Sequence, residues 1–299
     1  MGVEKEEIKI KIIYNNDEPA IGIVQIIHGM SEYSKRYLNF TDFLNKNRYI
    51  VVLSDHRGHG EEALKNGTLG LFSSSFDILV FDQVNISKNL KEQFPNLPFY
   101  ILGHSMGSFI AQKHMKVYSK EKFNYIFMGS CYERKFMTFV GKALFKSISL
   151  LTDNPKKIFN NIIFLGTNSK IKDKDKNSSS WLSRDSKVVK EFLDDPHCGF
   201  SYTPKFYYNF LDFLSKLYNR DSFNFVNKAT PILIISGEAD PIGLYGLGVK
   251  SLYNFYLNLG FSKLSLKLYK DCRHEILNEL NKNQVYDDIL LWMKKEGKV

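Results

Sequence analysis

The stretch that most constrains the fold is Gly-His-Ser-Met-Gly at residues 103–107. A short apolar run at residues 98–103 leads into it, and residues 110–118 follow with helical spacing. A Gly-x-Ser-x-Gly pattern at such a junction is typical of a sharp strand-to-helix turn, which strains the serine backbone and pushes the hydroxyl out above the edge of a sheet. The pattern predicts that Ser105 is a nucleophile. The alternatives are a helix cap or a chance match.

Six further runs of the chain are predicted strands because they are short, apolar and rich in β-branched or aromatic residues. They are residues 8–14, 21–29, 49–55, 123–129, 230–237 and 263–269. Helical patterns separate several of these runs, at residues 34–47 and 76–94. Continuous apolar strands that alternate with helices predict an α/β fold, in which helices cover both faces of a mostly parallel sheet.

The alternation of strands and helices stops between residues 130 and 228. This stretch has helical patterns and two loops rich in Asn, Lys and Ser, but no convincing strand. Because it lies between two predicted sheet strands, we expect a helical cap, or lid, folded over one end of the sheet. The predicted domains are therefore a core at 1–129 and 229–299 and a cap at 130–228.

A reactive serine needs a base to take its proton. In this architecture an acidic residue follows the serine and a histidine follows the acid. Asp240 comes just after the predicted strand 230–237, at the carboxyl edge where Ser105 is expected, and His274 is the only histidine after Asp240. The predicted triad is Ser105, Asp240 and His274. Glu238 stays open as the alternative acid, since spacing does not separate two carboxylates so close in sequence.

Two backbone amides are candidates to hold the negative charge that develops on an attacked carbonyl. Met106 follows the serine, and Met30 follows a His-Gly pair at the end of the predicted strand 21–29. The N–H groups of residues at these two places form the oxyanion hole of such sites. Only backbone is used, so methionine is acceptable at both places. Ordinary packing is the alternative reading of each methionine.

The remaining histidines are interpreted as structural. His28 and His56 end strands beside glycines, where ring nitrogens commonly bond backbone. His104 directly precedes Ser105, and strand alternation predicts that it points away from the serine. The three cysteines are widely spaced, so neither a disulfide framework nor a metal site is predicted. We expect no metal and no organic cofactor.

The charge balance is basic, with 41 Lys and Arg against 32 Asp and Glu and a net charge of +9. Such a surface attracts anionic partners. No dense basic block and no nucleic-acid motif accompanies it, so we expect no nucleic-acid partner. The charged N-terminus lacks an apolar leader, and no run of about 18 apolar residues occurs. With cysteines of the reduced type, a cytoplasmic location is expected.

Five motifs occur in an order that resembles one superfamily. They are HGMSEYSKRY (28–37), SDHRGHG (54–60), GHSMGS (103–108), GEADPIG (237–243) and RHEILNE (273–279). Their order resembles the α/β-hydrolase superfamily and, within it, the monoacylglycerol lipase and bacterial lysophospholipase branch, which is grouped with serine aminopeptidase S33-type hydrolases. The resemblance runs from about residue 20 to residue 293. It implies an α/β-hydrolase fold with a lid, and the triad and oxyanion donors already predicted.

The resemblance also implies residues that bind substrate. In monoacylglycerol lipases a Glu and an Arg after the His-Gly pair help hold the glycerol end, and by motif these are Glu32 and Arg36. An exposed charge pair is the alternative. The chain departs from the pattern at Ser31, where Gly is usual, and at Tyr33 and Leu277, where His is usual. These departures argue against a strict preference for glycerol.

Three segments of the predicted cap also carry the resemblance. WLSRD (181–185) and DPHCGF (195–200) resemble bacterial members called lysophospholipases. Residues 135–151 have apolar side chains at helical spacing with lysines between them, at Lys135, Lys142 and Lys146, and resemble the lid. Such a helix can lie on an anionic membrane surface with its lysines at the phosphates. The alternative is a helix whose apolar face covers the core.

The expected function is that of a serine hydrolase acting on lipid esters of medium or long acyl chains. Monoacylglycerols and lysophospholipids are the lead substrates, cleaved through an acyl-enzyme. A short-chain carboxylesterase and a peptidase of the same fold are the alternatives among enzymes. Outside enzymes, the alternative is a scaffold that binds a ligand in the same pocket without catalysis.

Overall fold

A computed structural model describes residues 8–119, 121–132, 135–173 and 176–297. One sheet of seven strands has the order β1-β3-β2-β4-β5-β6-β7. The strands are β1 (Ile10–Ile13), β2 (Gly22–Ile27), β3 (Tyr49–Ser54), β4 (Phe99–His104), β5 (Asn124–Met128), β6 (Ile232–Gly237) and β7 (Leu264–Tyr269). Among them β1 pairs antiparallel with β3, and the other pairs are parallel. The prediction of a mostly parallel sheet is confirmed.

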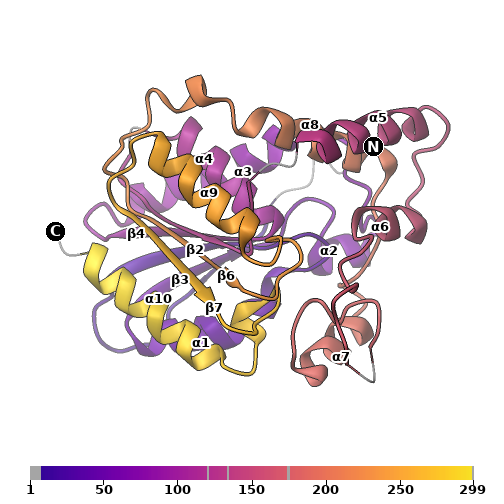
Figure 1. Cartoon of the computed structure of the whole chain (residues 1–299). Coiled ribbons are helices and arrows are strands. Elements are labelled where there is room, and N and C mark those ends of the chain that lie inside the picture. The colour runs from indigo at the N-terminus through magenta and orange to yellow at the C-terminus, as the bar shows by residue number, and fades with distance from the viewer. Residues whose placement is uncertain (1–7, 120, 133–134, 174–175, 298–299) are drawn as a thin grey trace.

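Helices cover both faces of the sheet (Figure 1). One face carries α1 (Leu38–Lys46) and α10 (Lys282–Glu296), and the other carries α3 (Phe76–Gln93), α4 (Met106–Val117) and α9 (Leu247–Asn258). A short helix, α2 (Gly60–Lys65), follows β3. Every residue of β2, β3, β4 and β6 is buried. This burial explains why those strands read as continuous apolar runs rather than as alternating ones.

Two apolar cores lie on opposite faces of the sheet. Ile101 of β4 packs into the core that contains Ile110 of α4. Its neighbour Leu102 packs into the other core, with Ile289 of α10. Successive strand side chains point to opposite faces, so one strand supplies both cores. Burial of each such side chain contributes about 1.5–3 kcal/mol, and together they hold the carboxyl ends of the strands in fixed positions.

The chain between β5 and β6 forms helices in its described parts, and no strand occurs there. The helices are α5 (Lys135–Ser149), α6 (Lys157–Ile163), α7 (Ser186–Asp194), α8 (Pro204–Leu217) and the 3-10 turn η3 (Arg220–Phe223). Figure 1 shows α5, α6 and α7 beside the sheet and beyond one of its ends. We refer to residues 130–228 as the insertion. Its boundaries as a separate domain stay a prediction.

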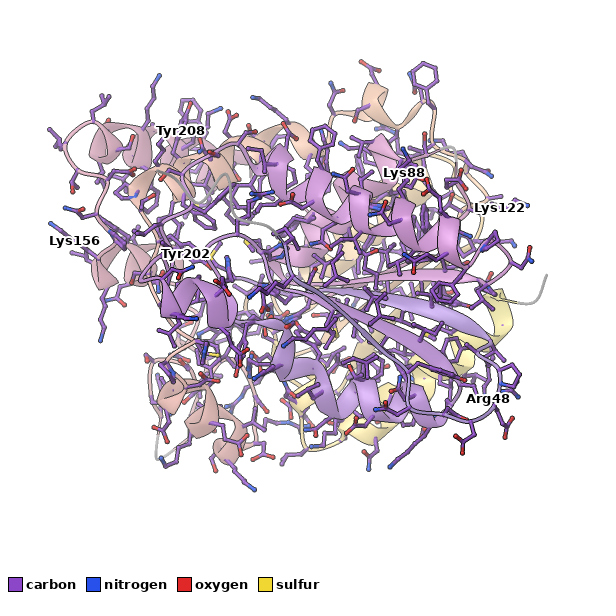
Figure 2. All side chains as sticks on the ribbon, turned by 180° about the vertical axis from the view of Figure 1, so that it is seen from behind. Arg48, Lys88, Lys122, Lys156, Tyr202 and Tyr208 are labelled. Atoms are coloured by element: carbon purple, nitrogen blue, oxygen red, sulfur yellow. The ribbon has the colours of Figure 1, made fainter. Side chains whose placement is uncertain are left out.

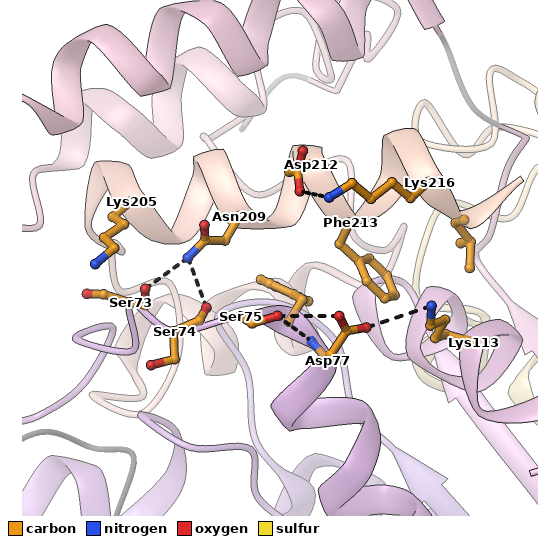
Figure 3. A pocket seen from close by; sticks show the side chains of 12 residues that line it. Ser73, Ser74, Ser75, Asp77, Lys113, Lys205, Asn209, Asp212, Phe213 and Lys216 are labelled. Carbon is orange, nitrogen blue, oxygen red and sulfur yellow. Dashed lines mark hydrogen bonds and ion pairs between the residues drawn. The ribbon is translucent and has the colours of Figure 1, made fainter. Parts of the chain in front are cut away.

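Helix α8 joins the insertion to the start of α3 (Figure 3). The side-chain amide of Asn209 donates to the carbonyl oxygens of Ser73 and Ser74, both at 2.9 Å. The ring of Phe76 lies 5.1 Å from the rings of Phe206 and Phe210. Polar contacts and tilted aromatic ring pairs thus attach this part of the insertion to the core.

Candidate active site

Ser105 sits at the turn between β4 and α4, as the sequence predicts. Its backbone angles are φ 51° and ψ −120°, a conformation that costs a residue other than glycine about 1–3 kcal/mol. Its N–H donates to the carbonyl of Met128 at 2.9 Å. A Cβ at Gly107 would lie 2.1 Å from the carbonyl oxygen of Ile27, and one at Gly103 would lie 2.3 Å from that of Gly107. Only glycine fits at either flank of the turn.

His274 and Asp240 form a buried pair at the ends of β7 and β6. Nδ1 of His274 lies 3.0 Å from Oδ2 of Asp240. The same carboxylate accepts from the Ser236 hydroxyl at 2.9 Å and from the Ile242 N–H at 2.8 Å. Burial raises the pKa of Asp240, but the neighbouring His274 and these hydrogen bonds outweigh burial and hold it below its ordinary value. Asp240 therefore keeps its negative charge although no part of it is exposed.

The electrostatics of His274 suit a base. Burial lowers its pKa, but the charge and hydrogen bond of Asp240, followed by Glu275, raise it above its ordinary value. The Asp240 carboxylate accepts a hydrogen bond from Nδ1–H, which leaves the lone pair of Nε2 available to take a proton. The ring packs between those of Trp181, at 5.0 Å, and His104, at 4.9 Å.

Glu238, the alternative acid, does not approach the histidine. Its side chain is exposed, whereas Asp240 is fully buried. Its backbone N–H donates to the carbonyl of Tyr269 at 2.9 Å, which ends the strand. The structure thus brings His274 together with Asp240.

Ser105 and His274 line one cavity of about 530 Å³ at the carboxyl edge of the sheet. Its wall also contains Met30, Glu32 and the aromatic side chains of Phe164, Trp181, Phe192 and Phe200. The lining is apolar along the rings and acidic at Glu32, Asp194, Asp195 and Glu275. A pocket of this kind binds a small molecule with one apolar part and one polar part.

The two predicted oxyanion donors flank this serine. Met106 is the first residue of α4, where backbone N–H groups lack helical partners and carry partial positive charge. Met30 lies in the loop after β2, which packs directly on the nucleophile turn: a Cβ at Gly29 would lie 3.2 Å from Cβ of Ser105. Both N–H groups therefore belong to backbone next to Ser105. Their role stays a prediction.

Glu32 is the centre of a buried polar network. Its Oε1 accepts from the Gly29 N–H at 2.6 Å and from the Tyr37 hydroxyl at 2.8 Å, and lies 2.9 Å from Nδ1 of His104. Its Oε2 accepts from Arg36 at 3.0 Å. Burial raises the pKa of Glu32, but His104 and Arg36 outweigh burial and lower it. Glu32 is thus a buried carboxylate at the cavity wall, not part of an exposed charge pair.

Arg36 has a different place from Glu32. Its guanidinium donates to both carboxylate oxygens of Glu275, at 2.5 and 2.7 Å, and lies 4.9 Å from the centre of the Phe192 ring. Arg36 is not among the described residues that line the cavity. From behind the cavity wall, Arg36 holds the wall residues Glu32 and Glu275 side by side. No sequence signal pointed to Glu275, because 239 positions separate it from Arg36.

The expectation that His104 points away from the serine is wrong. His104 lines the same cavity as Ser105, and its Nδ1 also lies 2.9 Å from the Tyr37 hydroxyl. Alternation of side chains holds only within a strand, and β4 ends at His104. The backbone turn at Ser105 brings both side chains to the cavity.

Two other histidines behave as the sequence indicates. Nδ1 of His28 lies 2.8 Å from the Gly29 carbonyl oxygen, and Nε2 of His56 lies 3.1 Å from the His28 carbonyl oxygen.

Within the described ranges, no group of three or more His, Cys, Asp or Glu side chains could hold a metal ion. No helix in the described part of the chain is both long enough and apolar enough to cross a membrane.

The loop that carries His274 is held by the WLSRD segment of the insertion. The N–H of Glu275 donates to the Leu182 carbonyl at 2.8 Å. Nε of Arg184 donates to Glu279 at 2.9 Å, and the same buried carboxylate accepts from the Arg273 N–H at 2.8 Å. This motif therefore supports the histidine loop, a role that sequence reasoning did not assign.

A second cavity, of about 410 Å³, lies under α8 and away from Ser105 (Figure 3). It is lined by polar side chains that pair with one another. Lys216 donates to Asp212 at 2.6 Å, and Lys113 lies 3.8 Å from Asp77. The described lining contains no histidine or cysteine, and its Ser75 caps α3 by accepting from the Asp77 N–H at 3.3 Å. The candidate active site is therefore the cavity at Ser105.

Comparisons with known proteins agree with this geometry. A family model described as serine aminopeptidase, S33, matches residues 18–281. The monoacylglycerol lipase of Mycolicibacterium smegmatis is 24% identical over 295 residues, which cover 95% of this chain and 93% of that protein. The human monoglyceride lipase is 32% identical over 89 residues, or 30% of this chain, and the match spans only 28% of the human protein.

A solved structure of similar fold extends the comparison to three dimensions. It is a highly thermostable carboxyl esterase from Bacillus coagulans in complex with glycerol, which is 26% identical in sequence with a TM-score of 0.88. The superposition covers 97% of this chain and 94% of that chain. The similarity therefore includes the insertion as well as the sheet.

Proposed function

The chain belongs to the serine aminopeptidase S33 family of hydrolases and has the α/β-hydrolase fold, and from that premise we propose that it cleaves lipid esters with Ser105 as nucleophile. The observation that carries the proposal is the buried His274–Asp240 pair, which lies at the same cavity as the strained serine. The matches to monoacylglycerol lipases support a lipid ester as substrate.

In the proposed reaction, Nε2 of His274 takes the proton of Ser105 as Oγ attacks the ester carbonyl. The N–H groups of Met30 and Met106 hold the oxyanion. Asp240 orients the imidazole and stabilises its charged form. His274 then gives the proton to the leaving alcohol, and an acyl-enzyme remains. Attack by water, with His274 again as base, releases the fatty acid.

The charges of the cavity favour an uncharged headgroup. Four carboxylates line it, those of Glu32, Asp194, Asp195 and Glu275, whereas Lys157 is the single lysine or arginine among its described lining residues. Arg36 offsets part of the charge of Glu32 and Glu275, but with Lys157 it still leaves four negative groups against two positive ones. A phosphate placed here would be repelled, whereas glycerol hydroxyls can donate hydrogen bonds to Asp194 or Asp195. We therefore place monoacylglycerols ahead of lysophospholipids. The acyl chain would lie along the aromatic part of the wall.

The test is a substrate panel combined with active-site labelling. The panel contains monoacylglycerols, lysophosphatidylcholine, p-nitrophenyl esters from acetate to palmitate, and aminoacyl amides. We expect hydrolysis of monoacylglycerols and of esters from octanoate upward. A fluorophosphonate probe should label the wild type, and Ser105→Ala should lose the label and at least about 10³-fold in kcat.

Each other outcome has a defined meaning. Preference for p-nitrophenyl acetate would indicate a short-chain carboxylesterase, and cleavage of the amides alone would indicate a peptidase. Lysophosphatidylcholine as the best substrate would overturn the argument from charge. No ester turnover together with no labelling of the wild type would indicate a scaffold that binds without catalysis.

A contact with an anionic membrane surface is the second part of the proposal. Phe136 and Phe139 of α5 are 76% and 72% exposed, and Leu150 and Leu151 just after it are 81% and 87% exposed. Aromatic and aliphatic side chains so exposed on one helix are typical of insertion into the headgroup region. Lysines at both ends of α5 and Lys156 at the rim of the insertion (Figure 2) would meet phosphates.

One lysine of α5 is not available for such a contact. Lys142 donates to Asp212 of α8 at 2.5 Å, so it ties the two helices together. Of the three lysines that the sequence singled out, Lys135 and Lys146 at the ends of the helix are therefore the ones proposed to face the lipid.

A further inference from the structure

The segment from Asp195 to Tyr202 supplies no group to the proposed chemical steps. It is nevertheless hydrogen-bonded to the loop that carries an oxyanion donor. We call residues 29–32 the oxyanion loop. The N–H of Ser31 donates to the Tyr202 hydroxyl at 2.6 Å, and its Oγ donates to the Phe200 carbonyl at 2.9 Å. Its carbonyl accepts from the Gly199 N–H at 2.9 Å. Every polar group of Ser31 is thus bonded to the insertion.

The backbone of Ser31 explains why so many bonds are needed. Its φ is 55°, a conformation that glycine adopts freely and that costs a serine about 1–3 kcal/mol. The three hydrogen bonds offset this strain. The Ser31 N–H belongs to the peptide plane that starts at the Met30 carbonyl, so a fixed N–H direction fixes that plane. The proposed donor, the Met30 N–H, lies in the neighbouring peptide plane on the other side of the Met30 Cα. Gly29, before it, is held by its N–H bond to Glu32 at 2.6 Å. With Gly29 and Ser31 both held, the orientation of the Met30 N–H depends on this anchor.

Tyr202 is built into the structure as a rigid support. It is fully buried, and its ring stacks on that of Phe206 with centroids 3.8 Å apart and planes 9° apart. Its hydroxyl also lies 2.6 Å from Nε2 of His59. Figure 2 shows the labelled Tyr202 where the insertion meets the core.

The hydrogen-bond roles around this hydroxyl are consistent. Burial, with the nearby rings of His28 and His56, holds the pKa of His59 well below its ordinary value, so His59 is neutral. Its Nδ1 lies 3.0 Å from the Arg57 carbonyl oxygen and donates to it, which leaves Nε2 as an acceptor. The Tyr202 hydroxyl therefore donates to His59 and accepts from Ser31.

Further contacts join the core next to the oxyanion loop to the same segment of the insertion. The Tyr33 hydroxyl donates to Asp195 at 2.9 Å, and its ring stacks on His197 at 4.7 Å. Nδ1 of His197 lies 2.8 Å from the same carboxylate. Ser31 in the oxyanion loop and Tyr33 just after it are thus both bonded to the insertion.

We propose that Tyr202 is a positioning residue of the hydrolase, whose hydroxyl holds Ser31 in its strained conformation and thereby aims the Met30 N–H at the oxyanion. This inference rests on the proposed function for its effect on catalysis. It assigns the DPHCGF segment, which the reaction itself does not use, to the support of the oxyanion loop.

The first test is Tyr202→Phe, assayed with p-nitrophenyl octanoate. Without the hydroxyl, Ser31 loses its partner and the oxyanion loop shifts, so kcat should fall about 10- to 100-fold with KM nearly unchanged. The matched control is Tyr256→Phe. Tyr256 is equally buried, but its hydroxyl donates to Gln112 at 3.0 Å and contacts neither the oxyanion loop nor the segment that holds it, so kcat should stay within about twofold of wild type.

The second test is rescue by glycine. Glycine at position 31 needs no anchor for a positive φ, so Ser31→Gly should restore most of the kcat lost in Tyr202→Phe. The proposal is overturned if Tyr202→Phe lowers kcat no more than Tyr256→Phe does, or if the glycine restores nothing.

Hydrogen exchange separates this proposal from the proposed function. Peptides that cover residues 29–32 should exchange at least about tenfold faster in Tyr202→Phe than in wild type or Tyr256→Phe, because the Ser31 N–H loses its acceptor. This readout needs no substrate. If wild type cleaves no ester but exchange still rises, the hydrolase proposal fails while the anchor stands. Unchanged exchange removes the anchor whatever the activity.

Discussion

Two serines with positive φ lie on either side of the candidate site, Ser105 at 51° and Ser31 at 55°. Each is a residue type that avoids this conformation, and each is held in it by bonds to distant segments. Strained backbone collects where a protein must present groups in a fixed direction. At the residue scale, the site contains two strained turns. The turn at Ser105 presents a hydroxyl, and the turn at Ser31 directly follows Met30, the proposed amide donor.

Replacement of the two neighbouring carboxylates tests which one serves His274. Asp240→Asn keeps the shape but removes the charge that holds the histidine tautomer, so kcat should fall about 10³- to 10⁴-fold. Glu238→Gln is the matched control, because that side chain is exposed, and its kcat should stay within about twofold of wild type. Steady-state kinetics with p-nitrophenyl octanoate measure both. A larger loss in Glu238→Gln than in Asp240→Asn would contradict the assignment.

Chain order predicted three side chains that the structure brings to one sheet edge, Ser105, Asp240 and His274. It did not separate Asp240 from Glu238, because their distinction is burial, which depends on how β6 ends in three dimensions. It did not predict Glu275 behind Arg36, because a contact across 239 positions leaves no local pattern.

At the scale of elements, α5 shows why the sequence left two readings open. Helical spacing of apolar residues predicts an apolar face, but not what that face meets. The structure has both cases on one helix. Phe145 is fully buried against the rings of Tyr207 and Phe159, whereas Phe136 and Phe139 point outward. The period of the pattern is the same for the buried and the exposed rings. Only the packing of α8 against α5 determines which of them is covered.

The exposed part of α5 provides a prediction about interfaces. The double change Phe136→Ser and Phe139→Ser should reduce sedimentation with phosphatidylglycerol vesicles at least about fivefold, because two aromatic anchors are lost. Hydrolysis of dissolved p-nitrophenyl octanoate, measured without vesicles, should be unchanged. The control is Phe225→Ser, which removes an equally exposed ring outside this helix. Undiminished sedimentation of the double variant would exclude α5 as the contact.

At the scale of the whole molecule, burial of neutral histidines predicts acid sensitivity. Burial lowers the pKa of His28 and of His114 to about 3 from an ordinary value of 6.5. The unfolded chain binds these protons at about pH 6.5 but the native protein does not, so stability is complete above 6.5 and falls as pH decreases toward 3. His274, with its raised pKa, acts in the opposite direction: its contribution is present below 6.5 and lost above its folded pKa.

Thermal unfolding followed by circular dichroism at pH 7.5, 6, 5 and 4 checks this. Tm should decrease steadily below pH 6.5. His114 accepts or donates at 2.9 Å to Ser87 and at 3.0 Å to Tyr125, so His114→Gln keeps a polar group of similar size without the titration. The dependence of Tm on pH should be shallower in that variant. A constant Tm from pH 7.5 to 4 would disprove the account.

The sheet as a whole was predictable, and the path of the insertion across it was not. Buried strands have a local signature, and all seven were identified before the structure, so the mostly parallel class followed. Strand order and the antiparallel direction of β1 depend on pairing between distant segments. The bonds from Leu182 to Glu275 and from Tyr202 to Ser31 also depend on contacts between distant segments, because they join parts of the chain more than 90 positions apart.

These bonds have a consequence for how a long acyl chain reaches the serine. Helix α7 is preceded by the segment bonded to the histidine loop and followed by the segment bonded to the oxyanion loop. Because the segments on both sides of α7 are bonded to catalytic loops, a movement of α7 would displace those loops. We therefore expect a long acyl chain to enter without displacing α7, so that the catalytic loops keep their positions while the substrate binds.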